Sequence, residues 1–128
     1  MRNLKYKILM VEDIKVAQKV AMLVLTDELG CNMDIAETGA QALQMVADNS
    51  YSLIFMDLGL PDIDGLTVAE TIRKNEKNSD PVPIIALTAH RDVGSRERCL
   101  EAGMNDFIEK PIKLEDCYRL LKKYARRN

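Results

Sequence analysis

Polar side chains suited to phosphate chemistry follow four short apolar runs of this chain. Glu12 and Asp13 follow the first run, and Asp57 follows the second. Thr88 and Lys110 follow the last two. If these runs are strands of one parallel sheet, their carboxyl ends lie along a single edge, where the acids, the hydroxyl and the ammonium would meet in one crevice. The sequence therefore predicts one site assembled from distant segments.

Three of these side chains are carboxylates, which repel one another when they lie close together. At an intermediate dielectric the repulsion amounts to about 4 kcal/mol for a close pair of charges. A divalent cation removes the conflict, and oxygen ligands with no nearby histidine or cysteine favour Mg²⁺ or Mn²⁺. We therefore predict that Glu12, Asp13 and Asp57 form the site of such a cation, with coordination positions left for phosphate oxygens.

Asp57 is the best candidate for a nucleophile within this cluster. A carboxylate at the tip of a buried strand is held rigidly, and the cation would offset its charge. Attack on phosphorus would convert it to an aspartyl phosphate, and the transferred group spreads negative charge over three oxygens. We expect Lys110 and Thr88 to supply the donors that stabilise this charge. We also predict a cis peptide bond before Pro111, because the cis form costs only ~0.5–1 kcal/mol there.

Each polar group also has a purely structural interpretation when it is taken alone. Glu12, Asp13 and Asp64 suit helix starts, where the helix dipole favours acids. Thr88 could serve as a helix cap, and Lys110 could be a surface lysine before a turn. The coincidence of acids, hydroxyl and ammonium at matching strand ends favours the common site over these separate explanations.

Strand-like and helix-like patterns alternate from one end of the chain to the other, as in a series of βα units. The strands are expected near residues 5–11, 32–36, 52–56, 83–87 and 106–109. Runs that are apolar throughout suit a sheet covered on both faces. With right-handed crossovers, five such strands favour the flavodoxin-like order 2-1-3-4-5, whose switch point lies between strands 1 and 3. We predict a three-layer α/β sandwich of the flavodoxin-like (βα)5 type, with Asp13 and Asp57 at that switch point.

Apolar residues recur at helical spacing between the strands, so that each helix can cover one face of the sheet. The stripe expected to bury the first helix consists of Val16, Val20, Leu23 and Val24. Thr38 with Gln41 resembles a capping box at the start of the second helix. Gly103 is placed to end a helix that starts near Ser95.

Length and composition limit the classes of protein to which this chain can belong. Its 128 residues, 47% of them hydrophobic, fit one domain spanning 1–128 with a sizeable core. Lysine and arginine number 18 against 20 acidic residues, which gives a net charge of -2 without the basic excess typical of nucleic-acid binding. We therefore expect no nucleic-acid partner.

The cysteines and the hydropathy favour a reducing, aqueous location. Cys31, Cys99 and Cys117 are odd in number and widely spaced, so they indicate neither a disulfide framework nor a thiolate metal site. We expect them to be small buried residues. The longest strongly apolar stretch, 20–25, is far short of the ~20 residues that a membrane helix needs. The start of the chain also lacks a signal-peptide pattern. The expected location is cytoplasmic, with no direct membrane contact.

Four motifs of this chain closely resemble the receiver domain of two-component response regulators, and the resemblance spans essentially the whole chain. The motifs are VEDI at 11–14, MDLGLPDIDG at 56–65, LTA at 87–89 and EKP at 109–111. The resemblance implies that Asp57 accepts phosphate from a histidine kinase or a histidine phosphotransfer protein. The Mg²⁺ ligands that it implies are Glu12, Asp13, Asp57 and the backbone carbonyl of Gly59. Thr88 would sense the phosphoryl group, and Lys110 would neutralise it.

Receivers of this family signal by coupling that threonine to an aromatic residue on strand 5, which moves inward and reshapes the face formed by helix 4, strand 5 and helix 5. Phe107 occupies the aromatic position. It lacks the hydroxyl of the common tyrosine, so switching and permanent burial both stay open. Gly59 and His90 occupy two positions that tune phosphate lifetime in the family. Gly59 has no side chain to orient water, and His90 could reach the phosphoryl group or simply lie exposed in a loop.

The amino-acid sequences of two segments most resemble those of receivers attached to hybrid sensor kinases. These segments are PIIALTAH at 83–90 and AGMNDFIEKPI at 102–112. Such a chain could act within a membrane-bound kinase, on its cytosolic side, or as a stand-alone regulator. We expect no enzyme activity beyond Mg²⁺-dependent self-phosphorylation from a donor and self-dephosphorylation. The sequence leaves a weak homodimer, the partner kinase and the stimulus open.

Three other functions share parts of this pattern. A haloacid-dehalogenase-like phosphatase also uses a strand-end aspartate and Mg²⁺, but it needs a second aspartate two residues on, where this chain has Gly59. A phosphorylation-independent interaction module would not need the intact set of Asp13, Asp57, Thr88 and Lys110. A flavin carrier is disfavoured because the sequence has no loop rich in serine, threonine and glycine to cradle a nucleotide phosphate.

Overall fold

Five parallel strands form one sheet in this computed structural model, which describes residues 3–77, 80–89 and 95–126. The strands are β1 (Lys7–Val11), β2 (Asn32–Ala36), β3 (Leu53–Asp57), β4 (Ile84–Thr88) and β5 (Asp106–Glu109). Their order is β2-β1-β3-β4-β5, which confirms the predicted flavodoxin-like topology. β3 and β4 end one residue later than expected, so Asp57 and Thr88 are the last residues of their strands.

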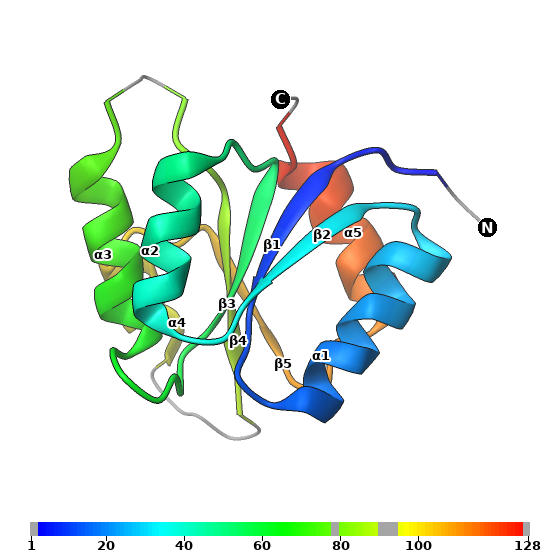
Figure 1. Cartoon of the computed structure of the whole chain (residues 1–128), viewed down its shortest axis with the longest axis horizontal. Coiled ribbons are helices and arrows are strands. Elements are labelled where there is room, and N and C mark those ends of the chain that lie inside the picture. Colours follow the sequence, from blue (N-terminus) through cyan, green and yellow to red (C-terminus); the bar gives the residue numbers. More distant parts are fainter. Residues whose placement is uncertain (1–2, 78–79, 90–94, 127–128) are drawn as a thin grey trace.

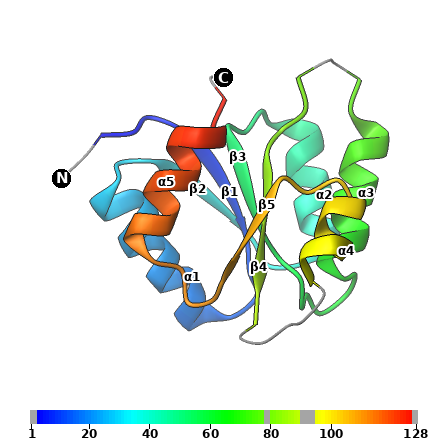
Figure 2. The same ribbon diagram turned by 180° about the vertical axis from the view of Figure 1, so that it is seen from behind.

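Helices cover both faces of the sheet (Figure 1, Figure 2). One face carries α2 (Gly39–Asp48), α3 (Gly65–Asn75) and α4 (Ser95–Glu101). The other face carries α1 (Lys15–Ala21) with its continuation η1 (Met22–Glu28), and α5 (Leu114–Tyr124). The strands run toward the lower edge of Figure 1, so their carboxyl ends gather there. Within the described part of the chain, no helix is both long enough and apolar enough to cross a membrane.

The sheet separates two hydrophobic clusters, because successive side chains of a strand point to opposite faces. Leu9 and Val11 of β1 belong to the cluster under α2 and α3, whereas Ile8 and Met10 belong to the cluster under α1 and α5. Every residue of β3 and β4 is buried. The central strands are therefore covered on both faces, as predicted, and they hold the side chains at their ends in fixed positions.

The prediction of the buried face of α1 was right for two of its four residues and wrong for the other two. Val16 is 71% exposed and Leu23 is 58% exposed, while Val20 and Val24 are partly buried. The buried residues of this helical segment are Gln18, Ala21 and Leu25. Because the buried stripe contains a glutamine, the apolar periodicity favoured the neighbouring stripe. The π-helical winding of η1 also shifts the later residues relative to a regular α-helix.

Most of the predicted helix ends are confirmed. Thr38 Oγ1 accepts a hydrogen bond from the backbone N–H of Gln41 at 3.0 Å. The side chain of Gln41 accepts from the backbone N–H of Glu37, one residue before the cap, rather than from the cap itself. α4 begins at Ser95, and Gly103 follows its end with a φ of 93°, a left-handed conformation that favours glycine.

The three cysteines are buried and form no disulfide. Burial raises the pKa of Cys31 to about 11 and that of Cys117 to about 12. Both thiols therefore stay protonated near neutral pH. They serve as small core residues, as the sequence predicts.

Candidate functional site

The strand order brings the predicted polar groups to one edge of the sheet. β1 and β3 are parallel neighbours, so the residues that follow β1 lie beside the end of β3. β4 pairs with β3 on its other side, and β5, which precedes Lys110, pairs with β4. Carboxylate oxygens of Glu12, Asp13 and Asp57 lie within 4.8 Å of one another. The acids and the lysine therefore share one corner of the molecule.

Asp57 is the last residue of β3 and is only 3% exposed. Its Oδ1 lies 2.9 Å from Nζ of Lys110 and accepts a hydrogen bond from the backbone N–H of Gly59 at 3.1 Å. Nζ of Lys110 also lies 3.3 Å from Oε1 of Glu12. Two carboxylates thus share one ammonium group. The Lys110–Pro111 peptide bond is cis, as predicted.

The environment of this corner shifts the ionisation of Glu12 and Lys110 in ways that follow from charge and burial. Burial is the main cause that raises the pKa of Glu12, and the nearby Asp57 raises it further. The backbone N–H of Ile14 and the Lys110 ammonium oppose this shift. Partial burial alone lowers the pKa of Lys110, but Asp57 and Glu12 raise it above the usual value for lysine. The acids therefore hold the ammonium in its charged form.

Asp13 carries a carboxylate oxygen without a partner. Its Oδ1 is buried and accepts no hydrogen bond from any residue that the structure describes. A buried carboxylate oxygen of this kind is costly unless a cation or a donor satisfies it. Three clustered acids with only oxygen donors match the ligand preference of a hard divalent cation such as Mg²⁺. The residues present therefore fit the metal that the sequence predicts.

Thr88 reaches the same edge, but its hydroxyl faces β5. Oγ1 of Thr88 donates to the backbone oxygen of Ile108 at 3.3 Å. Phe107, one residue earlier in β5, is only partly buried against the core. The guanidinium carbon of Arg96 lies 5.8 Å from the centre of its ring. The ring therefore has a cationic neighbour from α4, which sequence reasoning did not anticipate.

The remaining predicted positions differ in how much the structure says of them. Gly59 is exposed, and its backbone N–H binds Asp57. His90 lies outside the described residues. Asp64 caps α3, because its side chain accepts a hydrogen bond from the backbone N–H of Thr67 at 2.9 Å. The structural interpretation of a helix-start acid therefore applies to Asp64.

Two residues that shape this corner were missed by sequence reasoning. A Cβ on Gly65 would lie 2.4 Å from the backbone oxygen of Asp57, so a glycine is needed where α3 begins. The carboxylate of Asp62 accepts hydrogen bonds from the backbone N–H groups of Ala40 at 2.9 Å and Gly39 at 2.8 Å, which lower its pKa. The glycine that ends MDLGLPDIDG was a usable signal for the first. No local sequence pattern predicts the contacts of Asp62, because they join residues more than 20 positions apart.

Two hollows meet at the candidate site. One, of about 440 Å³, opens beside Asp57. The other is an apolar groove of about 320 Å³ between α1 and the turn after β5. Ile14 and Lys110 line both hollows. Ile14 is 53% exposed and Val16, which lines the groove, is 71% exposed, so an open apolar surface adjoins the acidic corner.

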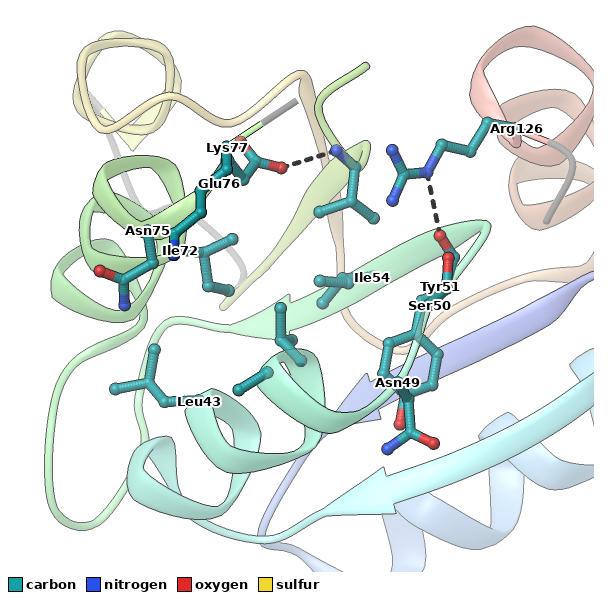
Figure 3. Close-up of a pocket in the computed structure, with 13 residues that line it drawn as sticks. Leu43, Asn49, Ser50, Tyr51, Ile54, Ile72, Asn75, Glu76, Lys77 and Arg126 are labelled. Atoms are coloured by element: carbon teal, nitrogen blue, oxygen red, sulfur yellow. Dashed lines mark hydrogen bonds between the residues drawn. The ribbon is translucent and has the colours of Figure 1, made fainter. Parts of the chain in front are cut away.

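A third hollow, of about 500 Å³, lies at the opposite end of the sheet between the C-terminal ends of α2 and α3 (Figure 3). Arg126 lines this hollow, and its Nε donates to the backbone oxygen of Tyr51 at 3.1 Å (Figure 3). Glu76 accepts from the backbone N–H of Val82 at 2.8 Å and from the guanidinium of Arg73 at 2.9 Å. Arg126 and Glu76, two of the polar residues that line this hollow, are thus engaged with the fold itself.

The family model for the response regulator receiver domain matches residues 8–122. The chain belongs to this family. Hybrid signal transduction histidine kinase B of Dictyostelium discoideum is 39% identical to this receiver domain over 129 residues, which cover 92% of the chain and 6% of the kinase. The aerobic respiration control sensor protein ArcB of Escherichia coli K12 is 36% identical, over 91% of the chain and 15% of the sensor. The chain thus spans a small part of these relatives.

Solved receiver structures match this receiver domain over most of its length. The receiver domain of sensor histidine kinase PA1611 from Pseudomonas aeruginosa PAO1, with a magnesium ion in its active site cleft, is 40% identical with a TM-score of 0.84, over 94% of this chain and 98% of that one. The receiver domain of Saccharomyces cerevisiae Ssk1, in complex with the histidine phosphotransfer protein Ypd1, is 28% identical with a TM-score of 0.84. This match covers 94% of this chain and 89% of the Ssk1 chain. The chain is therefore a receiver domain of the class found in hybrid kinases and response regulators of histidine phosphotransfer signalling.

Proposed function

We propose that this receiver domain accepts a phosphoryl group on Asp57 during histidine-to-aspartate phosphotransfer. The observation that carries the proposal is the position of Asp57. Its carboxylate is buried at the tip of β3, 2.9 Å from the Lys110 ammonium. It also lies beside the Asp13 oxygen that has no partner in the described part of the chain. A fixed nucleophile, a positive charge and a metal-binding group thereby share one corner. The domain would act as a signalling phosphoacceptor rather than as an enzyme on other substrates.

We infer that this corner binds Mg²⁺, or Mn²⁺, before phosphate arrives. The proposed ligands are Glu12, Asp13, Asp57 and the backbone carbonyl of Gly59. The clustered acids and the unpaired Asp13 oxygen support the inference, as does the magnesium ion in the PA1611 receiver structure. When bound, the cation offsets the charge of the acids and of the incoming phosphoryl oxygens.

The proposed phosphoryl transfer is a single displacement at phosphorus. The carboxylate of Asp57 forms the new P–O bond as the P–N bond of a donor phosphohistidine breaks, and the electron pair leaves with the imidazole nitrogen. Lys110 already contacts Asp57, so its ammonium can follow the negative charge onto the phosphoryl oxygens. The hydroxyl of Thr88 would exchange its bond to Ile108 for one to the phosphoryl group.

We propose that this exchange carries the signal to the surface formed by α4, β5 and α5. Phe107 lies in β5 next to Ile108, whose backbone oxygen Thr88 would release. The cation–π contact with Arg96 gives the ring a partner from α4 that requires no hydroxyl. An inward movement of Phe107 would break that contact. Partner binding to Phe107→Ala should therefore respond less to phosphorylation than binding to the wild type, and an equal response would refute the switch.

We propose that the donor is a histidine kinase or a histidine phosphotransfer protein that docks a helix over the apolar groove beside α1. The donor histidine must reach Asp57 past Ile14 and Lys110, which line both the site and the groove. Such a helix would bury Ile14 and Val16. Val16→Asp should slow transfer from a protein donor while leaving labelling by a small phosphodonor unchanged. Leu100→Asp, at another exposed apolar position, is the matched control.

The relatives also support a proposal about the setting of this domain. The kinases that it resembles are hybrid histidine kinases and sensors of which it spans 15% or less. We propose that residues 1–128 form one receiver domain that works in the cytoplasm, as part of such a kinase or as a separate regulator.

Phosphorylation by a small donor tests the proposed function. The protein is incubated with Mg²⁺ and acetyl phosphate, and Asp57→Asn is compared with the wild type. Asp64→Asn is the control, because Asp64 lies in the loop after Asp57 and asparagine preserves the cap of α3. We expect an acid-stable, base-labile adduct in the wild type and in the control, and none in Asp57→Asn.

Other outcomes of this experiment would contradict the proposal. Equal labelling of Asp57→Asn would move the nucleophile elsewhere. Absence of labelling in all three proteins would favour a phosphorylation-independent interaction module. Continuous hydrolysis of the donor and of other phosphate esters would favour a phosphatase.

A further inference from the structure

Gln18 is a polar side chain on the buried face of α1, where the next buried positions hold Ala21 and Leu25. It is 8% exposed. A buried amide is costly unless its polar atoms find partners. Its Nε2 donates to the backbone oxygen of Glu12 at 2.8 Å and to Oε2 of Glu37 at 2.9 Å. The amide therefore links the residue after β1 to the residue after β2.

Gln18 holds the chain on both sides of Asp13. Its side chain binds the backbone oxygen of Glu12, and its own backbone N–H donates to the oxygen of Ile14 at 3.0 Å. The carbonyl groups of the residues before and after Asp13 are thus bound to a single residue. Asp13 itself keeps a buried Oδ1 without a partner among the described residues. Gln18 thus holds the backbone of the turn that carries Asp13, together with the hydrogen bond from the Ile14 N–H to the Glu12 carboxylate.

The orientation of the Gln18 amide is determined by its two acceptors. A backbone oxygen and a carboxylate both accept hydrogen bonds, so only the NH₂ end of the amide fits between Glu12 and Glu37. The hydrogen bonds from Gln18 and from Lys15 lower the pKa of Glu37, which keeps this carboxylate an ionised acceptor. A glutamine in this position cannot flip without placing oxygen against oxygen.

We propose that Gln18 is a positioning residue for divalent-cation binding by this receiver domain. It would fix the turn that carries Glu12 and Asp13 and so preset their carboxylates for the cation. The inference rests on the proposed Mg²⁺ site. Replacing a group that holds the metal ligands in position, without itself binding the metal, typically lowers metal affinity 10–100-fold. Loss of the amide should therefore weaken Mg²⁺ binding without removing any proposed ligand.

The test measures Mg²⁺ binding directly on the unphosphorylated protein, by following backbone amide resonances in an NMR titration. Gln18→Met keeps the length and helix propensity of the side chain but removes the amide. Gln44→Met is the matched control, because Gln44 is exposed on α2 and donates to Asp48 far from the acids. We expect the Mg²⁺ dissociation constant to rise about tenfold in Gln18→Met and to stay unchanged in the control. Gln18→Arg, which can donate to both acceptors, should recover most of the affinity.

The rate of Asp57 labelling by acetyl phosphate separates positioning from general loss of structure. In Gln18→Met the Mg²⁺ concentration for half-maximal rate should rise, while the rate at saturating Mg²⁺ returns to the wild-type value. Should Gln18→Met fail to fold, Glu37→Leu removes the acceptor that orients the amide and should weaken Mg²⁺ binding in the same direction.

The two proposals fail in distinguishable ways. Equal Mg²⁺ dissociation constants in the wild type and in Gln18→Met would overturn the role of Gln18 and leave the metal site intact. Equal weakening in Gln18→Met and Gln44→Met would also overturn it. A wild-type protein that binds no Mg²⁺ would refute the proposed site itself, and with it the inference.

Discussion

The polar side chains at the two ends of the parallel sheet differ in their bonding partners. At the amino end, the guanidinium of Arg73 donates to Glu76 at 2.9 Å and to Asn105 at 3.1 Å. The side chains of Glu76 and Asn105 also accept hydrogen bonds from the backbone N–H groups of Val82 and Ile84, respectively.

At the carboxyl end, Oδ1 of Asp13 is buried without a partner among the described residues, and the ammonium of Lys110 contacts two acids. Both ends are polar and both are hollowed. Thr26 Oγ1, near the start of β2, is also buried without a partner among the described residues, so an unpaired atom alone does not distinguish the two ends. The clustering of three acids beside one ammonium distinguishes the carboxyl end, where we propose that the cation binds.

Replacing Lys110 with methionine should disable the carboxyl end while leaving the amino end intact. The change removes the ammonium that lies 2.9 Å from Asp57. Loss of one preorganised donor to developing charge typically costs 10²–10³ in rate, so labelling of Asp57 by acetyl phosphate should slow by about 100-fold. Initial rates at saturating Mg²⁺ measure the effect. Lys113→Met, an exposed lysine at the start of α5, serves as the control, and similar rates for the two variants would remove Lys110 from the chemistry.

Gly65→Ala should affect both stability and phosphorylation, because its Cβ would meet the backbone of Asp57, the proposed nucleophile. The added carbon would lie 2.4 Å from the backbone oxygen of Asp57 and 2.9 Å from Cα of Leu58. Overpacking of this kind typically lowers the free energy of unfolding by about 1–3 kcal/mol. Chemical denaturation and the labelling rate should both change. Gly59→Ala is the control for stability, since the nearest atom to its added Cβ would be Oδ1 of Asp57 at 4.0 Å. A Gly65 variant as stable as this control would contradict the geometry.

Arg73→Met should destabilise the fold without touching the chemistry. The change removes hydrogen bonds to the backbone oxygen of Gly103, to Glu76 and to Asn105. Leaving such partners unsatisfied costs about 1–3 kcal/mol in the free energy of unfolding. Denaturant titration measures this loss, and the exposed Lys74→Met is the control. The labelling rate per folded molecule should stay at the wild-type value. A slower rate would mean that the two ends are not independent.

Asp62→Asn should have a smaller effect that depends on pH. Asp62 lies near the candidate site, but its carboxylate already binds two backbone N–H groups of α2, so we expect a structural role. Those bonds lower its pKa below the ordinary value of 3.8. Its contribution to stability is therefore present above that value and lost as the pH falls through the lowered pKa. The melting temperature of the variant should lie slightly below that of the wild type at neutral pH and converge with it in acid. A difference that persisted in acid would rule out ionisation as its cause.

The strand ends were predictable because they depend on short-range patterns. Each apolar run marks a strand that is buried on both faces, and the alternation with helices determines which runs are neighbours. The positions of Asp57 and Thr88 followed from this pattern to within one residue of the observed strand ends. The contact between Lys110 and Asp57 followed from the same sheet order.

The polar contacts that support the site could not be predicted in the same way. Gln18 binds Glu37 across 19 positions, and Arg73 binds Gly103 across 30, so no local spacing announces either pair. The buried face of α1 was partly misassigned for the same reason, because a glutamine with two distant acceptors occupies a position where periodicity expects an apolar residue. Arg96 over the ring of Phe107 is likewise a contact between separate elements.

The role of Asp57 is tested most directly by locating the phosphoryl group. The wild-type protein is treated with acetyl phosphate and Mg²⁺, the aspartyl phosphate is reduced with borohydride to homoserine, and the modified residue is identified by mass spectrometry of the digested chain. The geometry of the acidic corner predicts homoserine at position 57 alone, in an amount that depends on Mg²⁺. Modification at Glu12, at Asp13 or at any other residue in place of Asp57 would contradict it.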